Sequence, residues 1–248
     1  MNMGRTISYI VATFDKPTFD RLTQDGTIQA RSIRDEIVLQ VQRDIISGVF
    51  LPGQRMVERE LIGRFGVSSI PVREALQDLE SRGLLTRRLN YGYSVVELSS
   101  MDVLRICELR RLVEPKVAEW AAERITAAEI RGLEVQLREM ERGARSADMG
   151  AFFHSDLGFH RLLWKASGNN FAAKALETAV GSLFASGLAR SLQATAAGKA
   201  APIDRVAEVA KHRRILEAIK ARRGEEAARE LLEMAEGFER NFRELILK

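Results

Sequence analysis

The chain has 248 residues, of which 46% are hydrophobic and 29% are charged, and its formal net charge is +4. This composition is typical of a globular protein and excludes collagen-like, low-complexity and disulfide-rich chains. No apolar run is long enough to span a bilayer, the N-terminus lacks the pattern of a secretion signal, and the single Cys107 has no internal partner. We therefore expect a cytoplasmic protein that does not associate with membranes.

The first part of the chain contains the pattern of a helix-turn-helix. Residues 1–30 show no clear period and are expected to form an extended or partly disordered arm. A short helix is predicted over 58–65 and a second over about 69–81, with a tight turn between them, and two short β-like runs flank Asn90-Tyr91-Gly92. Two such helices followed by a hairpin form a winged helix-turn-helix, which places its second helix in the DNA major groove. We predict a DNA-binding domain over residues 31–98.

From Ser99 onward only helices are predicted. Ser99 and Asp102 are typical of a helix start, as are Thr126 and Glu129. Further helices are expected over about 148–166, 171–194, 203–222 and 225–247. Long helices joined by short loops predict an antiparallel all-α bundle over residues 99–248. The expected fold class is therefore mainly α, with a small β wing.

Polar and basic side chains occupy the places from which a winged helix-turn-helix reads DNA. Ser68 and Ser69 lie at the tip of the second helix, and Arg73 follows one turn later. Arg59 precedes them on the first helix, and the wing adds a basic pair, Arg87 and Arg88. Each assignment has a structural alternative: an ion pair of Arg73 with Glu74 or Asp78, a solvated charge pair in the wing, and a helix cap at Ser68.

The same stretch resembles the GntR superfamily of bacterial transcription regulators. The resemblance rests on Pro52-Gly53, Glu58, Glu60-Leu61, Phe65-Gly66-Val67-Ser68, Pro71-Val72-Arg73-Glu74-Ala75-Leu76, Leu79-Glu80 and Gly83-Leu84. It implies that operator DNA is contacted by Arg59, Ser68, Ser69, Arg73 and Gly92. The family often has arginine where this chain has Ser69, so we expect a changed operator sequence or weaker specificity.

Three residues of the helical part form a candidate metal site. Asp156 and His160 are four residues apart and project from the same face of one helix. His212, on a later helix, completes the set across the bundle. The alternative is an ordinary hydrogen bond between these side chains, and His154 is expected at the surface.

The helical part resembles the FCD effector domain of the FadR-like branch of these regulators. The resemblance rests on Arg110 with Glu114, Asp156-Leu157-Gly158-Phe159-His160, Ser167-Gly168-Asn169 and His212. It implies a divalent metal of the zinc or nickel type on Asp156, His160 and His212, which binds a small carboxylate effector. The fourth ligand position of the family falls on Ala235, which offers no ligand atom, so a metal-free pocket is the alternative.

Arg110 and Asn169 are the candidate effector-binding residues. The guanidinium of Arg110 is expected to donate two hydrogen bonds to the effector carboxylate, and the amide of Asn169 to add a polar contact. The alternative for Arg110 is a salt bridge to Glu114 one turn away.

We interpret the chain as a homodimeric transcriptional regulator, and not an enzyme, whose operator binding is modulated by a small organic acid. One alternative is a metal-dependent hydrolase that uses Asp156, His160 and His212, although no nucleophile or general base is placed beside them. A second is an architectural DNA binder without an effector, which a collapsed bundle pocket would favour.

Overall fold

The structure, a computed structural model, describes residues 32–146, 148–187 and 204–246. Residues 33–248 form one unit, separate from residues 1–32. The predicted N-terminal arm lies outside the described residues. None of the helices described is both long enough and apolar enough to cross a membrane.

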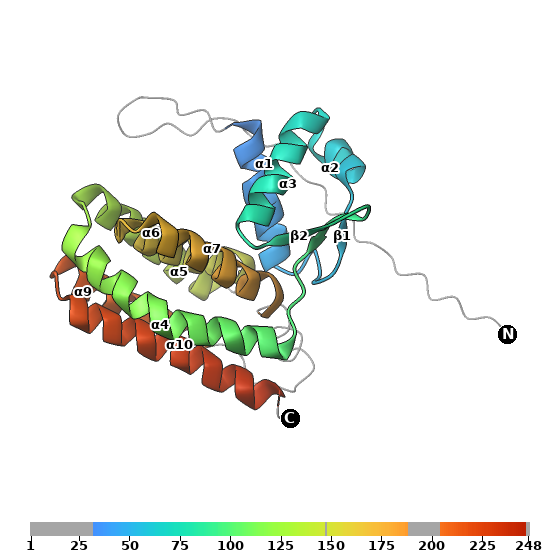
Figure 1. Cartoon of the computed structure of the whole chain (residues 1–248). Helices are drawn as coiled ribbons and strands as arrows, with labels where there is room; N and C mark the ends of the chain where they lie inside the picture. Colours follow the sequence, from blue (N-terminus) through green and yellow to red (C-terminus); the bar gives the residue numbers. More distant parts are fainter. Residues whose placement is uncertain (1–31, 147, 188–203, 247–248) are drawn as a thin grey trace. The chain divides into compact units, whose positions relative to one another are not determined.

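The first part of the described chain is a winged helix-turn-helix (Figure 1). Its elements are α1 (Ile33–Ile46), β1 (Arg55–Met56), α2 (Glu58–Phe65), α3 (Ser69–Ser81), β2 (Leu85–Arg88) and β3 (Gly92–Val95). The predicted bounds of α2 and α3 are confirmed. Gly66, between them, has a φ of 64°, and its N–H donates to the carbonyl of Ile62. This left-handed conformation favours glycine because glycine has no Cβ, and it produces the tight turn.

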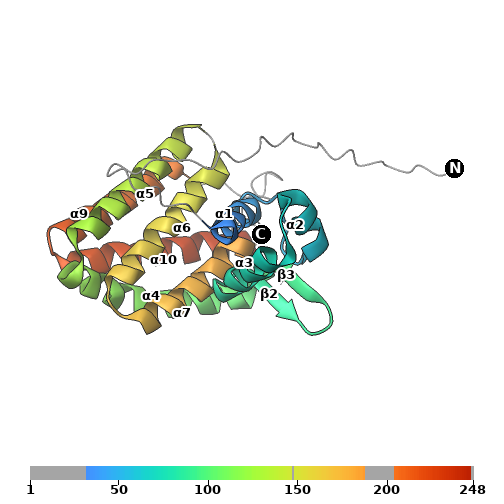
Figure 2. The same cartoon turned by 90° about the horizontal axis from the view of Figure 1, so that it is seen from above.

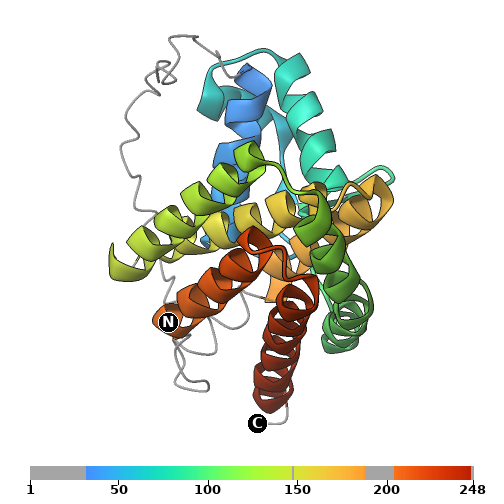
Figure 3. The same ribbon diagram turned by 90° about the vertical axis from the view of Figure 1, so that its left-hand side faces the viewer.

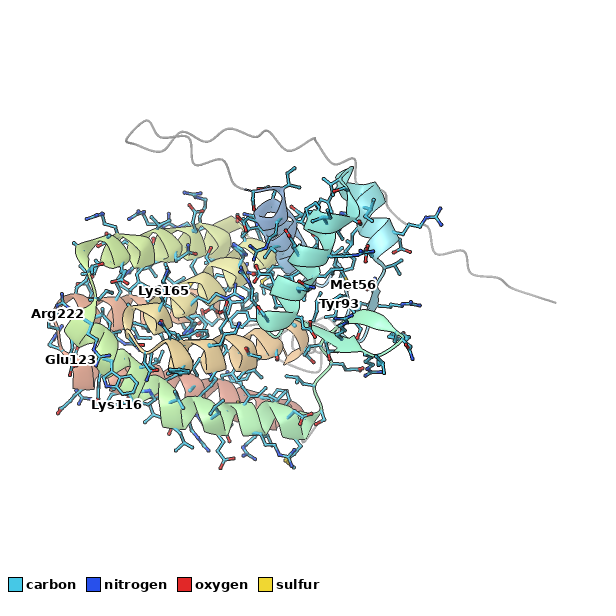
Figure 4. The ribbon with its side chains drawn as sticks, turned by 45° about the horizontal axis from the view of Figure 1, so that its top comes forward. Met56, Tyr93, Lys116, Glu123, Lys165 and Arg222 are labelled. Carbon is cyan, nitrogen blue, oxygen red and sulfur yellow. The ribbon has the colours of Figure 1, made fainter. Side chains whose placement is uncertain are left out.

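The three strands form an antiparallel sheet in the order β1-β3-β2. Met56 pairs with Tyr93, and both are labelled in Figure 4; Arg88 pairs with Gly92 across the hairpin. The sequence predicted β2 and β3 but missed β1, because a strand of two residues shows no alternation of apolar and polar positions. Helices α1 and α3 contribute completely buried side chains to the core of this part, among them Val41, Val72 and Leu79.

An acidic side chain connects α1 to the end of α3. Asp78 accepts hydrogen bonds from Arg34 at 2.9 Å and from Arg82 at 2.9 and 2.8 Å. Partial burial acts to raise the pKa of Asp78, but the two guanidinium groups outweigh it and hold the pKa below its usual value.

We expect Asp78→Asn to lower the free energy of unfolding by about 1–2 kcal/mol at pH 7, because a charge-assisted contact is lost at a partly exposed site. The carboxylate stabilises the fold fully above its unfolded pKa, and this contribution is lost as the pH falls through the lowered folded pKa. Urea unfolding of both proteins should therefore show a difference at pH 7 that shrinks at pH 3. The same difference at both pH values would contradict this role for the Asp78 charge.

The second part of the chain is the predicted all-α bundle. Its elements are α4 (Ser100–Arg124), α5 (Ala127–Ser146), α6 (Met149–Ala166), α7 (Asn170–Ser182), η1 (Leu183–Gly187), α9 (Arg205–Lys220) and α10 (Gly224–Ile246). Both predicted helix starts are confirmed: Ser99 and Asp102 cap each other's backbone, as do Thr126 and Glu129. The predicted helix over 171–194 is α-helical only to Ser182, and a π-helical turn follows.

Helix α6 has a central place in the bundle. It packs against α4, α5 and α7, while α4 lies along α10 (Figures 1 and 3). Phe152, Phe159 and Trp164 of α6 are almost completely buried. The candidate metal ligands on α6 therefore face the interior of the bundle.

Helices α6 and α7 also contact the winged helix-turn-helix. Helix α1 lies beside α6 (Figure 2), and Nη1 of Arg161 donates to Oε1 of Gln42 at 2.8 Å. At the end of α3, a Cβ added to Gly181 would lie 2.0 Å from the carbonyl oxygen of Arg82. Gly83, with a φ of 72°, is equally confined by the backbone of α7. The two backbones thus meet too closely for a side chain on either glycine.

Candidate functional site

The first turn of α3 presents small polar side chains to solvent. Ser68 is exposed, Ser69 is half-buried and Ile70 is 65% exposed. Ser68 has the extended backbone of an N-cap, but its hydroxyl makes no capping hydrogen bond. Helix capping therefore does not occupy this hydroxyl.

Arg73 lies one turn further along the same exposed face. Its Nε donates to Oε1 of Glu58 on α2 at 2.8 Å, and this hydrogen bond raises the pKa of Arg73. Asp78, one of the two neighbours considered from the sequence, instead pairs with Arg34 and Arg82. Exposed ion pairs are weak, so DNA can replace Glu58 as the partner of Arg73.

The wing places guanidinium groups over tyrosine rings. Arg87 lies over Tyr93 at 5.7 Å, and Arg55 lies over Tyr91 at 4.9 Å. Sequence analysis missed Arg55 because it missed the strand β1. Its place as a basic residue two positions after Pro52-Gly53 was the signal that could have identified it.

The remaining predicted DNA-binding residues lie where the sequence placed them. Arg59 is exposed on α2, and Arg88 is exposed at the end of β2. Gly92 has a φ of 88° and open space where a Cβ would stand. Its requirement for glycine is therefore conformational.

A cavity of about 130 Å³ lies inside the bundle. The polar side chains that line it are Arg110, Asp156, His160, Glu208, His212 and Asn241. The apolar ones are Phe153, Leu183, Phe184, Met234, Phe238 and Phe242. The structure thus brings the three predicted metal ligands and Arg110 into one cavity.

Asp156, His160 and His212 meet across α6 and α9. Their candidate ligand atoms all lie within 4.8 Å of one another. Nε2 of His212 is 3.0 Å and Nε2 of His160 is 3.5 Å from the same oxygen of Asp156. Two imidazoles and one carboxylate at this separation are a donor set that suits zinc and nickel.

The environment adjusts the charge of each ligand. Burial lowers the pKa of His160 to about 3, so its ring is neutral, and its Nδ1 has no hydrogen-bond partner among the described residues. Burial also acts to lower the pKa of His212, but the nearby Asp156 outweighs it and the net shift is upward. For Asp156, burial acts to raise the pKa, but the nearby His212 outweighs it and the pKa is lowered. Neutral imidazole and ionised carboxylate are the forms that bind metals, so His160 and Asp156 fit such an ion.

Nδ1 of His212 lies 2.8 Å from the carbonyl oxygen of Glu208, which orients the ring. Such a contact directs the other ring nitrogen, Nε2, toward the cavity and Asp156. On α10, Met234 lines the cavity, whereas Ala235 is completely buried and is not among the lining residues. Met234 therefore contributes a thioether to the cavity wall, and Ala235 contributes no ligand atom.

Arg110 forms the salt bridge to Glu114 that the sequence left open as an alternative. Its Nε donates to Oε2 of Glu114 at 3.1 Å, and its guanidinium lies 5.9 Å from the centre of the Phe238 ring. Glu114 is completely buried, which raises its pKa despite the charge of Arg110. The salt bridge and the ring hold Arg110 in place while it lines the cavity.

The structure does not bring Asn169 to this cavity. Its side chain caps α7 by accepting hydrogen bonds from the N–H groups of Phe171 and Ala172. It lines a separate surface depression with Trp120 and Arg124. The assignment of Asn169 to the effector site therefore has no geometric support. His154, expected at the surface, is half-buried, with Nδ1 3.2 Å from Nε2 of Gln42 on α1.

The apolar lining of the cavity was not predicted from the sequence. Met234, Phe238 and Phe242 recur every four residues on one face of α10. This spacing was the available signal, but it is equally typical of side chains that pack in a helix-bundle core. Only the arrangement of α4, α6, η1, α9 and α10 around the cavity shows which apolar side chains border it.

The comparisons with known proteins agree with both parts of the structure. Residues 33–95 match the family model described as "Bacterial regulatory proteins, gntR family", and residues 105–237 match the FCD domain. The uncharacterized HTH-type transcriptional regulator YdhC of Bacillus subtilis is 32% identical over 194 residues, which are 78% of this chain and 83% of that protein. The galactonate operon transcriptional repressor of Escherichia coli is 30% identical over 169 residues, 60% of this chain and 72% of that one.

Solved structures show the same fold. The structure of McbR/YncC from E. coli superimposes with a TM-score of 0.67 at 21% identity and covers 84% of this chain and 95% of its own. The winged helix-turn-helix and the helical bundle are thus shared over almost the whole described chain. The chain belongs to the GntR family of bacterial transcriptional regulators, in the group that carries an FCD domain, and it is a regulator rather than an enzyme.

Proposed function

We propose that this regulator is a cytoplasmic homodimer that reads an operator through α3 and the wing and senses a small carboxylate in the bundle cavity. The observation that carries the proposal is the meeting of Arg110 with Asp156, His160 and His212 in one cavity. The DNA-binding domain comprises residues 31–98 and the sensing and dimerisation domain residues 99–248.

The metal part of the proposal rests on the donor set. Asp156, His160 and His212 hold a divalent ion, which supplies positive charge for the carboxylate of the effector. Arg110 faces the same cavity and binds the carboxylate by charge-assisted hydrogen bonds. The chain's own residues thus bind and orient the acid.

A connection from the cavity to the DNA-binding part runs through α6. This helix carries Asp156 and His160 at the cavity, while the adjacent Arg161 donates to Gln42 on α1. A shift of α6 on effector binding would move α1, on which α3 packs. In a dimer, such a movement changes the spacing of the two recognition helices relative to the two halves of an operator.

Metal binding is tested by thermal unfolding after dialysis against a chelator. Adding zinc or nickel at about 100 times Kd should stabilise the wild type by about 2.7 kcal/mol, a rise in Tm of roughly 5–10 °C. The variants His160→Ala and His212→Ala should show no such rise. His154→Ala is the matched control, because His154 also lies on α6 but does not line the cavity. An unchanged rise in all three variants would rule out this site.

A further inference from the structure

We propose that the effector is a compact aromatic monocarboxylate, a single ring that bears one carboxylate, rather than a hydroxylated sugar acid. The inference rests on the proposed function for the carboxylate end of the ligand and extends it to the body of the ligand. It depends on how the polar and apolar groups of the cavity are distributed.

Most polar groups of the cavity already have partners, and Nδ1 of His160 is an exception among the described residues. Asp156 and His212 are 3.0 Å apart, and Arg110 is fixed by Glu114, so these residues form one charged end that suits a single carboxylate. The carboxylate of Glu208 pairs with Lys211 at 2.6 Å. The last polar lining residue, Asn241, is exposed to solvent. The buried part of the cavity thus offers few partners for a row of hydroxyl groups.

The rest of the wall is apolar and rich in aromatic rings. Phe153 and Phe184 meet edge to face with their ring centres 6.4 Å apart, and Phe238 stacks on Phe242 at 6.4 Å. Aromatic ligands gain from such rings through edge-to-face and offset contacts, and Met234 adds a flexible, polarisable neighbour. A polyhydroxylated acid would instead lose its hydrogen bonds to water without replacement.

The size of the cavity suits a ligand with a single ring. Its volume is about 130 Å³, and an engineered apolar cavity of about 150 Å³ takes up one benzene molecule. A long acyl chain or a fused ring system exceeds this space. The guanidinium of Arg110, 5.9 Å from the Phe238 ring, brings the charged end next to the aromatic wall, as a carboxylate bonded directly to a ring requires.

The test is calorimetric titration of the metal-loaded, full-length protein with benzoate, galactonate and benzyl alcohol. We expect benzoate to bind at least about tenfold more tightly than galactonate, because an apolar site discriminates against added hydroxyl groups. Benzyl alcohol, which keeps the ring but lacks the carboxylate, should bind more weakly than benzoate by about tenfold or more.

Variants of the aromatic wall provide a second measurement. Phe184→Leu and Phe238→Leu alter half-buried side chains and should weaken benzoate binding by about two- to tenfold. Phe171→Leu is the matched control, because Phe171 is 90% exposed and lies outside the cavity, and its affinity should equal that of the wild type.

The possible results distinguish failure of the aromatic assignment from failure of the carboxylate-sensing function. Tighter binding of galactonate than of benzoate, lost when Arg110 and Glu114 are both changed to glutamine, would overturn the aromatic assignment and leave the carboxylate-sensing function intact. Binding of neither acid, with the metal bound, would overturn both. Benzoate binding that is equally strong in Phe184→Leu, Phe238→Leu and Phe171→Leu would also reject the aromatic wall as the binding surface.

Discussion

Replacing Arg73 by alanine is expected to weaken binding to the operator by roughly 5- to 150-fold, with a much smaller loss on random DNA. The reason is geometric: Arg73 lies one turn into α3, on the exposed face, and an exposed ion pair with Glu58 holds it. We propose that a guanidinium in this place contacts base edges, which carry the sequence information, whereas phosphate contacts are the same on any duplex. Gel-shift titration on a duplex selected from a random pool, with a scrambled duplex beside it, measures both losses.

Glu58→Gln is the matched control for Arg73. It removes the charge of the partner but leaves the guanidinium, so operator affinity should be retained or increased, since the carboxylate no longer competes with DNA. Equal losses on operator and scrambled duplex in Arg73→Ala would show that Arg73 contacts phosphate only. A loss in Glu58→Gln as large as in Arg73→Ala would show that the ion pair itself, rather than a base contact, supports binding.

The second large effect is expected at the buried ion pair of Arg110 and Glu114. Arg110→Gln alone leaves a completely buried carboxyl without its partner and should lower the free energy of unfolding by about 3–5 kcal/mol. The double variant Arg110→Gln/Glu114→Gln replaces the pair by two neutral amides and leaves no unpaired buried charge, so much of this stability should return. The double variant should also bind carboxylates roughly tenfold or more weakly, because a charge-assisted hydrogen bond is lost.

Chemical denaturation and ligand titration of the single and double variants separate the structural role of Arg110 from its binding role. Full carboxylate affinity in the folded double variant would show that Arg110 serves only as the partner of Glu114. Restored stability with lost affinity is the result that assigns Arg110 to the ligand.

The fold of this chain was predictable from local signals. Gly66 and the paired caps at Ser99–Asp102 and Thr126–Glu129 act within a few residues of their own positions, so they can be recognised without a structure. Strand β1 was not predictable, because its two residues become a strand only by pairing with β3. The π-helical turn after Ser182 was not predictable either, since the periodicity of the sequence does not distinguish it from a continuing α-helix.

The residues of the candidate sites, like the fold, were predictable where the signal is local and unpredictable where it depends on packing. Asp156 and His160 share a helix face by spacing alone, but the pairing of His212 with them depends on how α9 packs on α6. The partner of Arg73 proved to be Glu58, on another helix, which local sequence does not indicate. Asn169 was assigned to the effector site by resemblance, but its side chain caps the N-terminus of α7. Long-range packing, rather than residue type, determines which partners these side chains have.

The measurement that most directly tests the central claim is the Kd of the selected operator, with and without a carboxylate that binds the cavity. Such a ligand is identified by calorimetry as one whose binding is lost in the folded double variant Arg110→Gln/Glu114→Gln. We predict that it changes the operator Kd of the metal-loaded wild type by about fivefold or more and leaves that of the double variant unchanged. A ligand that occupies the cavity but leaves the operator Kd of the wild type unchanged would contradict the account.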